Sequence, residues 1–221
     1  MFEREPITAG ELMDKQFLPK PVIVEGMLPA GTYILAGTPK IGKSFLMTQL
    51  CWSVAEGIPF LGLATRKSTV LYLALEDTQE RLQSRLARMF GTDWAGSEFH
   101  LLFQINQQGD ALIQRFQDFI LEHPDTRLIV IDTLQRVRES DGSSYSYSHD
   151  YETIMPLKTF ADAYDVALIV VHHTRKNEDD DNLFNQISGT NGLLGAADGA
   201  FLLHQGKNDV LGIMYTHKSP C

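Results

Sequence analysis

The stretch Gly37-Thr-Pro-Lys-Ile-Gly-Lys-Ser44 fits the pattern G-x-x-x-x-G-K-[ST] and predicts a phosphate-binding loop. Glycine at positions 37 and 42 allows the backbone to turn its N–H groups inward around an anion. Lys43 supplies a positive charge for the β- and γ-phosphates, and Ser44 supplies a hydroxyl for Mg²⁺. Because each of these residues has a chemical reason, the motif favours a nucleotide site over an ordinary glycine-rich turn.

The segments on either side of this loop support the prediction. Residues 32–36 form a short β-rich apolar run, and the apolar residues after the loop recur with the period of a helix. A strand that enters the loop and a helix that leaves it place the anion at the helix N-terminus. We expect nucleotide contacts from nine consecutive residues: Gly37, Thr38, Pro39, Lys40, Ile41, Gly42, Lys43, Ser44 and Phe45.

Length and charge limit the classes of protein to consider. The 221 residues suffice for one α/β domain with a large core. The formal net charge of −9 gives no bulk positive field for nucleic acid, so any nucleic-acid contact must be local. Two cysteines without zinc-binding spacing fit a reducing cytosol. The charged N-terminus lacks the apolar core of a signal peptide, and no apolar run approaches the ~20 residues of a membrane span. We therefore expect a cytoplasmic protein with no membrane partner.

Residues 1–30 have the composition of an N-terminal arm. Thr8 and Glu11 form a capping box for a helix over residues 8–17, and prolines surround the β-like run that follows. The helix has one apolar face, formed by Leu12, Met13 and Phe17. This face could pack on the chain's own domain or on a neighbouring copy, and the sequence leaves both open. The main domain is expected over residues 31–221.

An acidic pair follows the near-continuous apolar run of residues 69–75, which is typical of a buried parallel strand. Asp77 and Glu80 form a D-x-x-E capping box for the next helix, which explains Asp77. Glu76 has no such structural reason. A carboxylate at the C-terminal end of a parallel strand points into the crevice where α/β sheets bind ligands. Glu76 is therefore our candidate for the base that orients water against a γ-phosphate.

Two further apolar strands end in polar residues. Residues 127–133 close on Asp132 in the Walker B pattern, whose carboxylate is expected to hold the Mg²⁺ shell opposite Ser44. Residues 166–171 lead into His172 and His173. Strands that alternate with helices predict an α/β fold with a mainly parallel sheet covered by helices on both faces. Phosphate-loop proteins of many functions share that architecture, so further residues must decide the function.

Two loops at the ligand-facing edge carry basic residues. The first, residues 135–150, includes Arg136 and Arg138 among serines and tyrosines, and could either contact bases and phosphates or serve as a connection. The second starts with Arg175 and Lys176 and then turns acidic over residues 178–181, which argues against the whole loop lying on DNA.

Four motifs together resemble the RecA-like ATPases. They are the phosphate-binding loop, Glu76 after the next long strand, L-I-V-I-D-T-L-Q at residues 128–135 and V-V-H-H-T-R-K at residues 170–176. The likeness is greatest to the plasmid- and phage-type RepA replicative helicases, which are related to the DnaB group. It runs from roughly residue 28 to residue 201, and residues 31–221 would then be a RecA-like ATPase domain.

The resemblance implies roles for the candidate residues. Lys43 and Ser44 would bind phosphate and metal, Glu76 would polarise the attacking water, and Asp132 would support Mg²⁺. His173 falls where such enzymes place a γ-phosphate sensor, and His172 could fill that role instead.

The resemblance also implies a hexameric ring that hydrolyses ATP between subunits and moves single-stranded DNA through its centre with 5′–3′ polarity. Residues 135–150 and 174–189 fall where the family has its channel loops. Arg136, Arg138, Arg175 and Lys176 are therefore candidate DNA contacts.

One departure from the family favours a second hypothesis. RecA-like rings generally supply an arginine in trans from their last strands, whereas this sequence has no arginine after Arg175. Lys218 is the candidate substitute. The alternative is therefore a RecA-like regulator or loading factor that binds ATP and a protein partner without translocating. A small-molecule kinase and a GTPase fit less well, because the arginine-rich lid and the N-K-x-D motif are both missing from the sequence.

Overall fold

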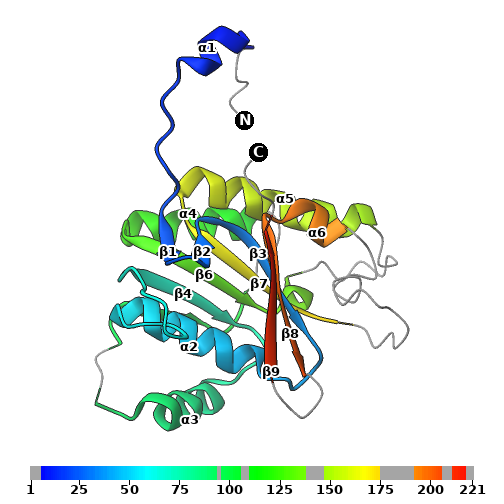
Figure 1. Cartoon of the computed structure of the whole chain (residues 1–221). Helices are drawn as coiled ribbons and strands as arrows, with labels where there is room; N and C mark the ends of the chain where they lie inside the picture. The colour runs from blue at the N-terminus through cyan, green and yellow to red at the C-terminus, as the bar shows by residue number, and fades with distance from the viewer. Residues whose placement is uncertain are drawn as a thin grey trace.

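A parallel sheet forms the centre of the computed structural model, which describes residues 6–93, 96–105, 110–137, 147–174, 192–205 and 211–217. Within those ranges its seven strands have the order β5-β4-β6-β7-β3-β8-β9 (Figure 1). All neighbouring pairs are parallel except β8 and β9. The strands are β3 (Gly31–Gly37), β4 (Thr69–Ala74), β5 (Phe99–Leu102), β6 (Thr126–Asp132), β7 (Ala167–His173), β8 (Gly199–Gln205) and β9 (Leu211–His217).

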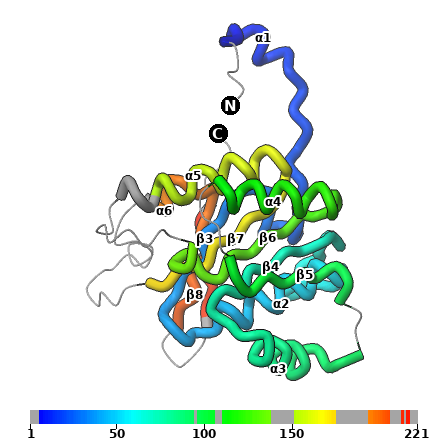
Figure 2. The backbone as a smooth tube through the Cα atoms, turned by 180° about the vertical axis from the view of Figure 1, so that it is seen from behind, coloured from blue at the N-terminus to red at the C-terminus, as the bar shows by residue number. Residues whose placement is uncertain are grey.

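Helices cover both faces of the sheet (Figures 1 and 2). One face carries α2 (Lys43–Glu56) and α3 (Gln79–Phe90); the other carries α4 (Asp110–Glu122), α5 (Tyr147–Tyr164) and α6 (Gly192–Ala196). The alternation of strand side chains divides the core accordingly. In β3, Tyr33 and Leu35 belong to the cluster beneath α2, whereas Ile34 and Ala36 belong to the cluster beneath α5. The expected α/β architecture is therefore confirmed.

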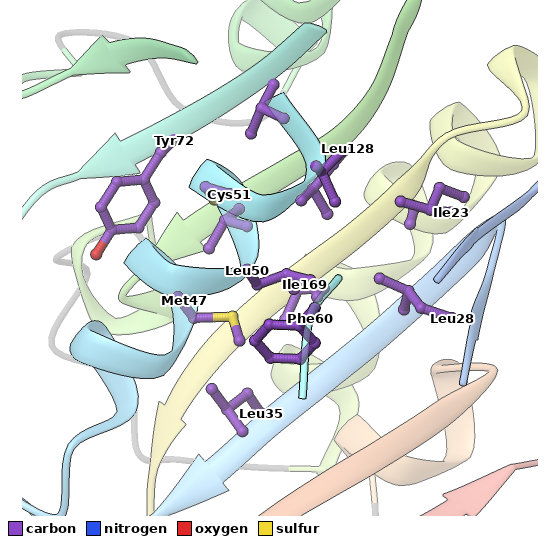
Figure 3. Packing of buried hydrophobic residues seen from close by; sticks show 14 of the residues in the cluster. Ile23, Leu28, Leu35, Met47, Leu50, Cys51, Phe60, Tyr72, Leu128 and Ile169 are labelled. Carbon is purple, nitrogen blue, oxygen red and sulfur yellow. The ribbon is translucent and has the colours of Figure 1, made fainter. Parts of the chain in front are cut away.

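The packing of α2 fixes the start of that helix over the carboxyl ends of the strands. Its Met47 and Leu50 lie against Leu35 of β3 and Ile169 of β7, as Figure 3 shows. Leu50 is only 1% exposed. Cys51 on the same helix is fully buried, and this burial raises the pKa of its thiol. The cysteine is thus a small core residue, and α2 is held firmly on the sheet.

The N-terminal segment divides into a packed part and a free part. Strands β1 (Val22–Val24) and β2 (Leu28–Pro29) pair with each other, and Ile23 and Leu28 are buried in the core. Residues 6–20 are exposed along their whole length, and α1 (Ala9–Met13) stands away from the domain (Figure 1). The division of the chain at residue 30 stays a prediction.

The capping box of α1 is confirmed, but the expected extent of the helix is wrong. The Thr8 hydroxyl accepts from the Glu11 N–H, and the Glu11 carboxylate accepts from the Thr8 N–H. The helix ends at Met13 rather than at residue 17, because short helices without tertiary contacts gain little from propagation. Met13 and Phe17 are 84% and 74% exposed, so the apolar face does not pack on its own domain.

Candidate nucleotide-binding site

The phosphate-binding loop connects the end of β3 to the start of α2, as the motif predicts. Gly37 is the last residue of β3, and a Cβ there would lie 2.7 Å from the carbonyl oxygen of Leu203. Gly42 has a φ of 108°, in the region that favours glycine, and α2 begins at Lys43. Both glycines therefore have a structural reason, and the N–H groups of the first turn of α2 are available for an anion.

Lys43 is folded back onto its own loop. Its Nζ donates to the carbonyl oxygens of Gly37 and Thr38 at 2.7 and 2.9 Å, and it lies 3.0 Å from Nδ1 of His173. The residue is only 4% exposed. This burial lowers the pKa of Lys43 to about 8, although the carboxylates of Asp132 and Glu76 act in the opposite direction. The ammonium group is thus held next to the place where the motif puts the β- and γ-phosphates.

Asp132 lies opposite Ser44, as the Walker B pattern predicts. Its carboxylate is hydrogen-bonded to the Ser44 hydroxyl and accepts a 2.7 Å hydrogen bond from the hydroxyl of Tyr72. Burial raises the pKa of Asp132, while these two hydrogen bonds act in the opposite direction. A hydroxyl and a carboxylate are oxygen ligands that Mg²⁺ accepts in phosphate-transfer sites.

This pair fits a Mg²⁺ ion that arrives with a nucleotide better than a site built from protein ligands alone. In the described ranges, no group of three or more His, Cys, Asp or Glu side chains could hold a metal by itself. Mg²⁺ in phosphate-transfer sites takes one or two protein ligands and completes its shell with phosphates and water.

Glu76 follows the end of β4 and faces the same place. Its Oε1 accepts a 2.8 Å hydrogen bond from the hydroxyl of Thr133, and its Oε2 lies 3.7 Å from Nε2 of His173. Together with Ser44 and Asp132 it lines a cavity of about 150 Å³. Because β4 and β6 are neighbours in the sheet, their carboxyl ends bring Glu76 and Asp132 to one edge.

The expected capping box at Asp77 is wrong. Thr78 is the N-cap of α3, and its hydroxyl accepts from the Arg81 N–H. Asp77 forms ion pairs instead, at 2.7 Å with Arg85 and at 3.4 Å with Arg81. Threonine is also a good N-cap residue, so the sequence allowed either start for the helix, and the structure uses the later one.

The two histidines at the end of β7 lie on opposite faces of the sheet, because successive strand side chains alternate. The contacts with Lys43 and Glu76 belong to His173. Of the candidate DNA contacts, Arg136 is exposed in the short helix η1 (Leu134–Arg136). Arg138, Arg175, Lys176 and the proposed finger Lys218 lie outside the described residues, so those predictions remain open.

The sequence as a whole identifies the family. A family model described as "AAA domain" matches residues 2–179, which is most of the chain. The chain belongs to this AAA domain family. Within the described part of this AAA domain, no helix combines the length and the hydropathy of a membrane span.

Curated relatives of this AAA domain include DNA repair proteins. RadA of Streptococcus pneumoniae (strain ATCC BAA-255 / R6) is 28% identical over 158 residues, which are 70% of this chain and 33% of RadA. RadA of Helicobacter pylori (strain J99) is 26% identical over 157 residues, which are 70% of this chain and 31% of that protein. The chain thus spans about a third of the length of these relatives.

Solved structures share the fold of this AAA domain. A KaiC-like protein from Pyrococcus horikoshii OT3 superimposes with a TM-score of 0.64 at 18% identity, covering 93% of this chain and 89% of the other. The ATPase domain of a helicase gives a TM-score of 0.62 at 14% identity, covering 84% and 80%. These identities establish the fold alone, which confirms the expected RecA-like phosphate-loop architecture.

Sequence reasoning missed three contributors to the site of this AAA domain. Tyr72 holds Asp132, Thr133 holds Glu76, and Arg85 pairs with Asp77 beside the cavity. The Arg85 guanidinium also lies 4.8 Å from the ring centre of Phe45. Only the eight-residue separation of Asp77 and Arg85, about two helical turns, offered a signal in the sequence, because the other two contacts join different strands.

Proposed function

We propose that the chain hydrolyses ATP in the cavity lined by Ser44, Glu76 and Asp132. The observation that carries this proposal is the convergence of two carboxylates from neighbouring strands on the first turn of α2. Binding alone would need only the loop and Asp132. A second carboxylate that lines the cavity and carries no charge partner closer than His173 at 3.7 Å supports a role as general base.

The residues divide the work of the reaction. Ser44 and Asp132 would hold Mg²⁺, which neutralises charge on the phosphate oxygens when it is bound. Lys43 would exchange the carbonyl oxygens of its own loop for the β- and γ-phosphates. Glu76 would take a proton from water while the water oxygen bonds to the γ-phosphorus. The bond from that phosphorus to the bridging oxygen breaks, and ADP and phosphate leave.

His173, rather than His172, is our proposed sensor of the γ-phosphate. Its Nδ1 accepts from Lys43, so the neutral ring carries its hydrogen on Nε2, which faces Glu76. When Lys43 turns to a phosphate, Nδ1 loses this donor. The ring therefore registers whether the lysine is occupied by nucleotide.

Replacing Glu76 by glutamine tests this proposal, because the amide keeps the size of the side chain but is a very poor proton acceptor. We expect ATP binding to persist and hydrolysis to fall by about 10²-fold or more. Glu80→Gln is the matched control, because Glu80 is an exposed glutamate on the neighbouring helix. Turnover of Glu76→Gln at the parental rate would refute the assignment. Greater damage from Asp77→Asn would show that the acidic pair is assigned in the wrong order.

We further propose that hydrolysis drives movement along single-stranded DNA in replication, with 5′–3′ polarity. The helicase-like motifs and the likeness to RadA, a DNA repair protein by name, support this proposal. The candidate contacts are Arg136, Arg138, Arg175 and Lys176. Single-stranded DNA should stimulate turnover, and its affinity should fall as salt rises, because phosphate contacts release counterions. An affinity that does not depend on salt would argue against these contacts.

A regulator or loading factor that binds ATP without translocating is the second candidate. The net charge of −9 and the absence of any arginine after Arg175 in the sequence favour it. The two functions differ in one measurement. A motor shows DNA-stimulated ATPase activity together with strand displacement, whereas a regulator shows neither.

The arm supports a homo-oligomer. Its apolar residues are exposed on one copy, and an apolar hollow of about 540 Å³ lies between α3 and β5, at the opposite end of the molecule from α1 (Figures 1 and 2). The hollow is lined in part by Leu82, Leu86, Leu101 and Phe103. We propose that the arm of one copy occupies this hollow on the next. A contact between opposite ends is heterologous and closes into a ring, here a hexamer, when its rotation closes.

Light scattering tests this assembly. Met13→Asp with Phe17→Asp should shift the mass toward the monomer, because the charges oppose burial of the apolar face. Leu121→Asp is the matched control, since Leu121 is a 78% exposed leucine on α4. A mass that is the same for the arm variant and the parent would refute this use of the arm.

A further inference from the structure

Thr133 is the residue after Asp132, and its hydroxyl makes a 2.8 Å hydrogen bond to Oε1 of Glu76. We infer that Thr133 is a positioning residue that orients the Glu76 carboxylate for its reaction with water. The inference rests on the proposed hydrolysis, and it assigns a role to a side chain outside the nucleotide-binding motif. The argument has three parts, which concern the sheet register, the freedom of Glu76 and the choice of oxygen.

The register of the sheet brings the two residues together. Ala74 of β4 pairs with Asp132 of β6, and the next N–H along, that of Leu75, donates to the carbonyl oxygen of Asp132 at 2.8 Å. The chain segments that carry Glu76 and Thr133 therefore leave the sheet side by side. Thr133 is 1% exposed, so its hydroxyl is shielded from exchange with bulk water.

Glu76 needs such a partner because its own position leaves it free to turn. Its side chain is 40% exposed, and it follows the end of the strand rather than lying within it. A glutamate side chain has several rotatable bonds, and catalysis requires the reacting oxygen within hydrogen-bond reach of the proton it removes. One donor from a buried side chain removes much of this freedom before the nucleotide arrives.

The hydrogen bond also distinguishes the two carboxylate oxygens. Oε1 accepts from Thr133, whereas Oε2 lies 3.7 Å from Nε2 of His173. Oε2 is therefore the oxygen that receives the proton of water. Because Thr133 follows Asp132 directly, one strand end presents both the carboxylate that faces the metal-binding serine and the hydroxyl that holds the base.

Thr133→Val tests this inference, because valine has a similar shape but no hydroxyl. We expect kcat to fall by about 10- to 100-fold, the range for a lost hydrogen bond to a charged group. The affinity for a non-hydrolysable ATP analogue with Mg²⁺ should stay within about twofold, since ground-state binding does not use Glu76. Thr133→Ser should recover most of the rate because it restores the donor.

Two controls separate positioning from a loss of packing. Thr126→Val makes the same change at the other end of β6, where the Thr126 hydroxyl donates to the carbonyl oxygen of His123, and it should leave kcat unchanged. In a Glu76→Gln background, Thr133→Val should lower the remaining rate by less than about twofold, because the two residues act as one unit.

Three results would overturn the inference: a parental kcat in Thr133→Val, an equal loss in Thr133→Ser, or full additivity with Glu76→Gln. A parental rate in Glu76→Gln alone would instead refute the proposed function. The two failures are therefore distinguishable.

Discussion

The buried position of Lys43 predicts that nucleotide affinity falls above pH 8. Burial lowers the pKa of Lys43 from 10.5 to about 8, and only the protonated ammonium attracts phosphates. With that pKa, Lys43 is about 90% protonated at pH 7 and about 10% protonated at pH 9. The dissociation constant for a Mg²⁺–nucleotide complex should therefore rise about tenfold between pH 7 and pH 9, which corresponds to ~1.4 kcal/mol.

Equilibrium titration with a non-hydrolysable ATP analogue between pH 7 and pH 9.5 measures this change. The other titratable groups at the site are Glu76, Asp132 and His173. Lys43→Ala serves as the control, because a chain without the lysine should bind weakly and should lose the pH dependence above pH 8. Glu76→Gln should keep it, since the dependence arises from the ammonium group.

Two outcomes would refute this reasoning. An affinity that is constant up to pH 9.5 would mean that the lysine keeps its ordinary pKa and is not buried as the structure shows. An affinity that falls equally in Lys43→Ala would assign the titration to another group.

Three further predictions concern stability. Leu50→Ala should lower the free energy of unfolding by about 2–5 kcal/mol, because Leu50 is 1% exposed in the core beneath α2; urea denaturation measures it, and a loss below ~1 kcal/mol would contradict the packing. Asp77→Asn should cost about 1–3 kcal/mol in the same assay, because it weakens the ion pair with Arg85, and an unchanged stability would contradict that pair. Thr8→Ala removes the cap of an exposed helix, so the melting temperature of the isolated chain should stay the same, and a clear decrease would show that the arm packs on its own domain.

Local sequence patterns predicted the elements that carry the site. The helix over residues 110–122 matches α4, because a regular apolar face is followed by Pro124, which ends it. The phosphate-binding loop was predictable because its glycines, lysine and serine act through backbone conformation and charge at fixed spacing. Glu76 and Asp132 were found because each ends an apolar strand, and parallel strands bring such ends to one edge.

Contacts between distant segments were not predictable in the same way. Tyr72 lies within the apolar strand β4, where its residue type gave no sign that its hydroxyl reaches Asp132. Thr133 has the appearance of an ordinary residue at a strand end, and only the pairing of β4 with β6 brings it to Glu76. The wrong capping box at Asp77 has a related cause, since two adjacent residues could each start the helix and the choice depends on where the arginines lie.

The internal hydrogen bonds of Lys43 have a consequence for folding. A buried ammonium without partners would be a large cost, but here two carbonyl oxygens and one imidazole nitrogen surround it. The domain can therefore reach its native state in the absence of nucleotide. ATP then competes with groups that already satisfy the lysine, so binding gains only the difference between two sets of contacts. A loop built in this way favours release of the product as well as capture of the substrate, which suits a site that must turn over repeatedly.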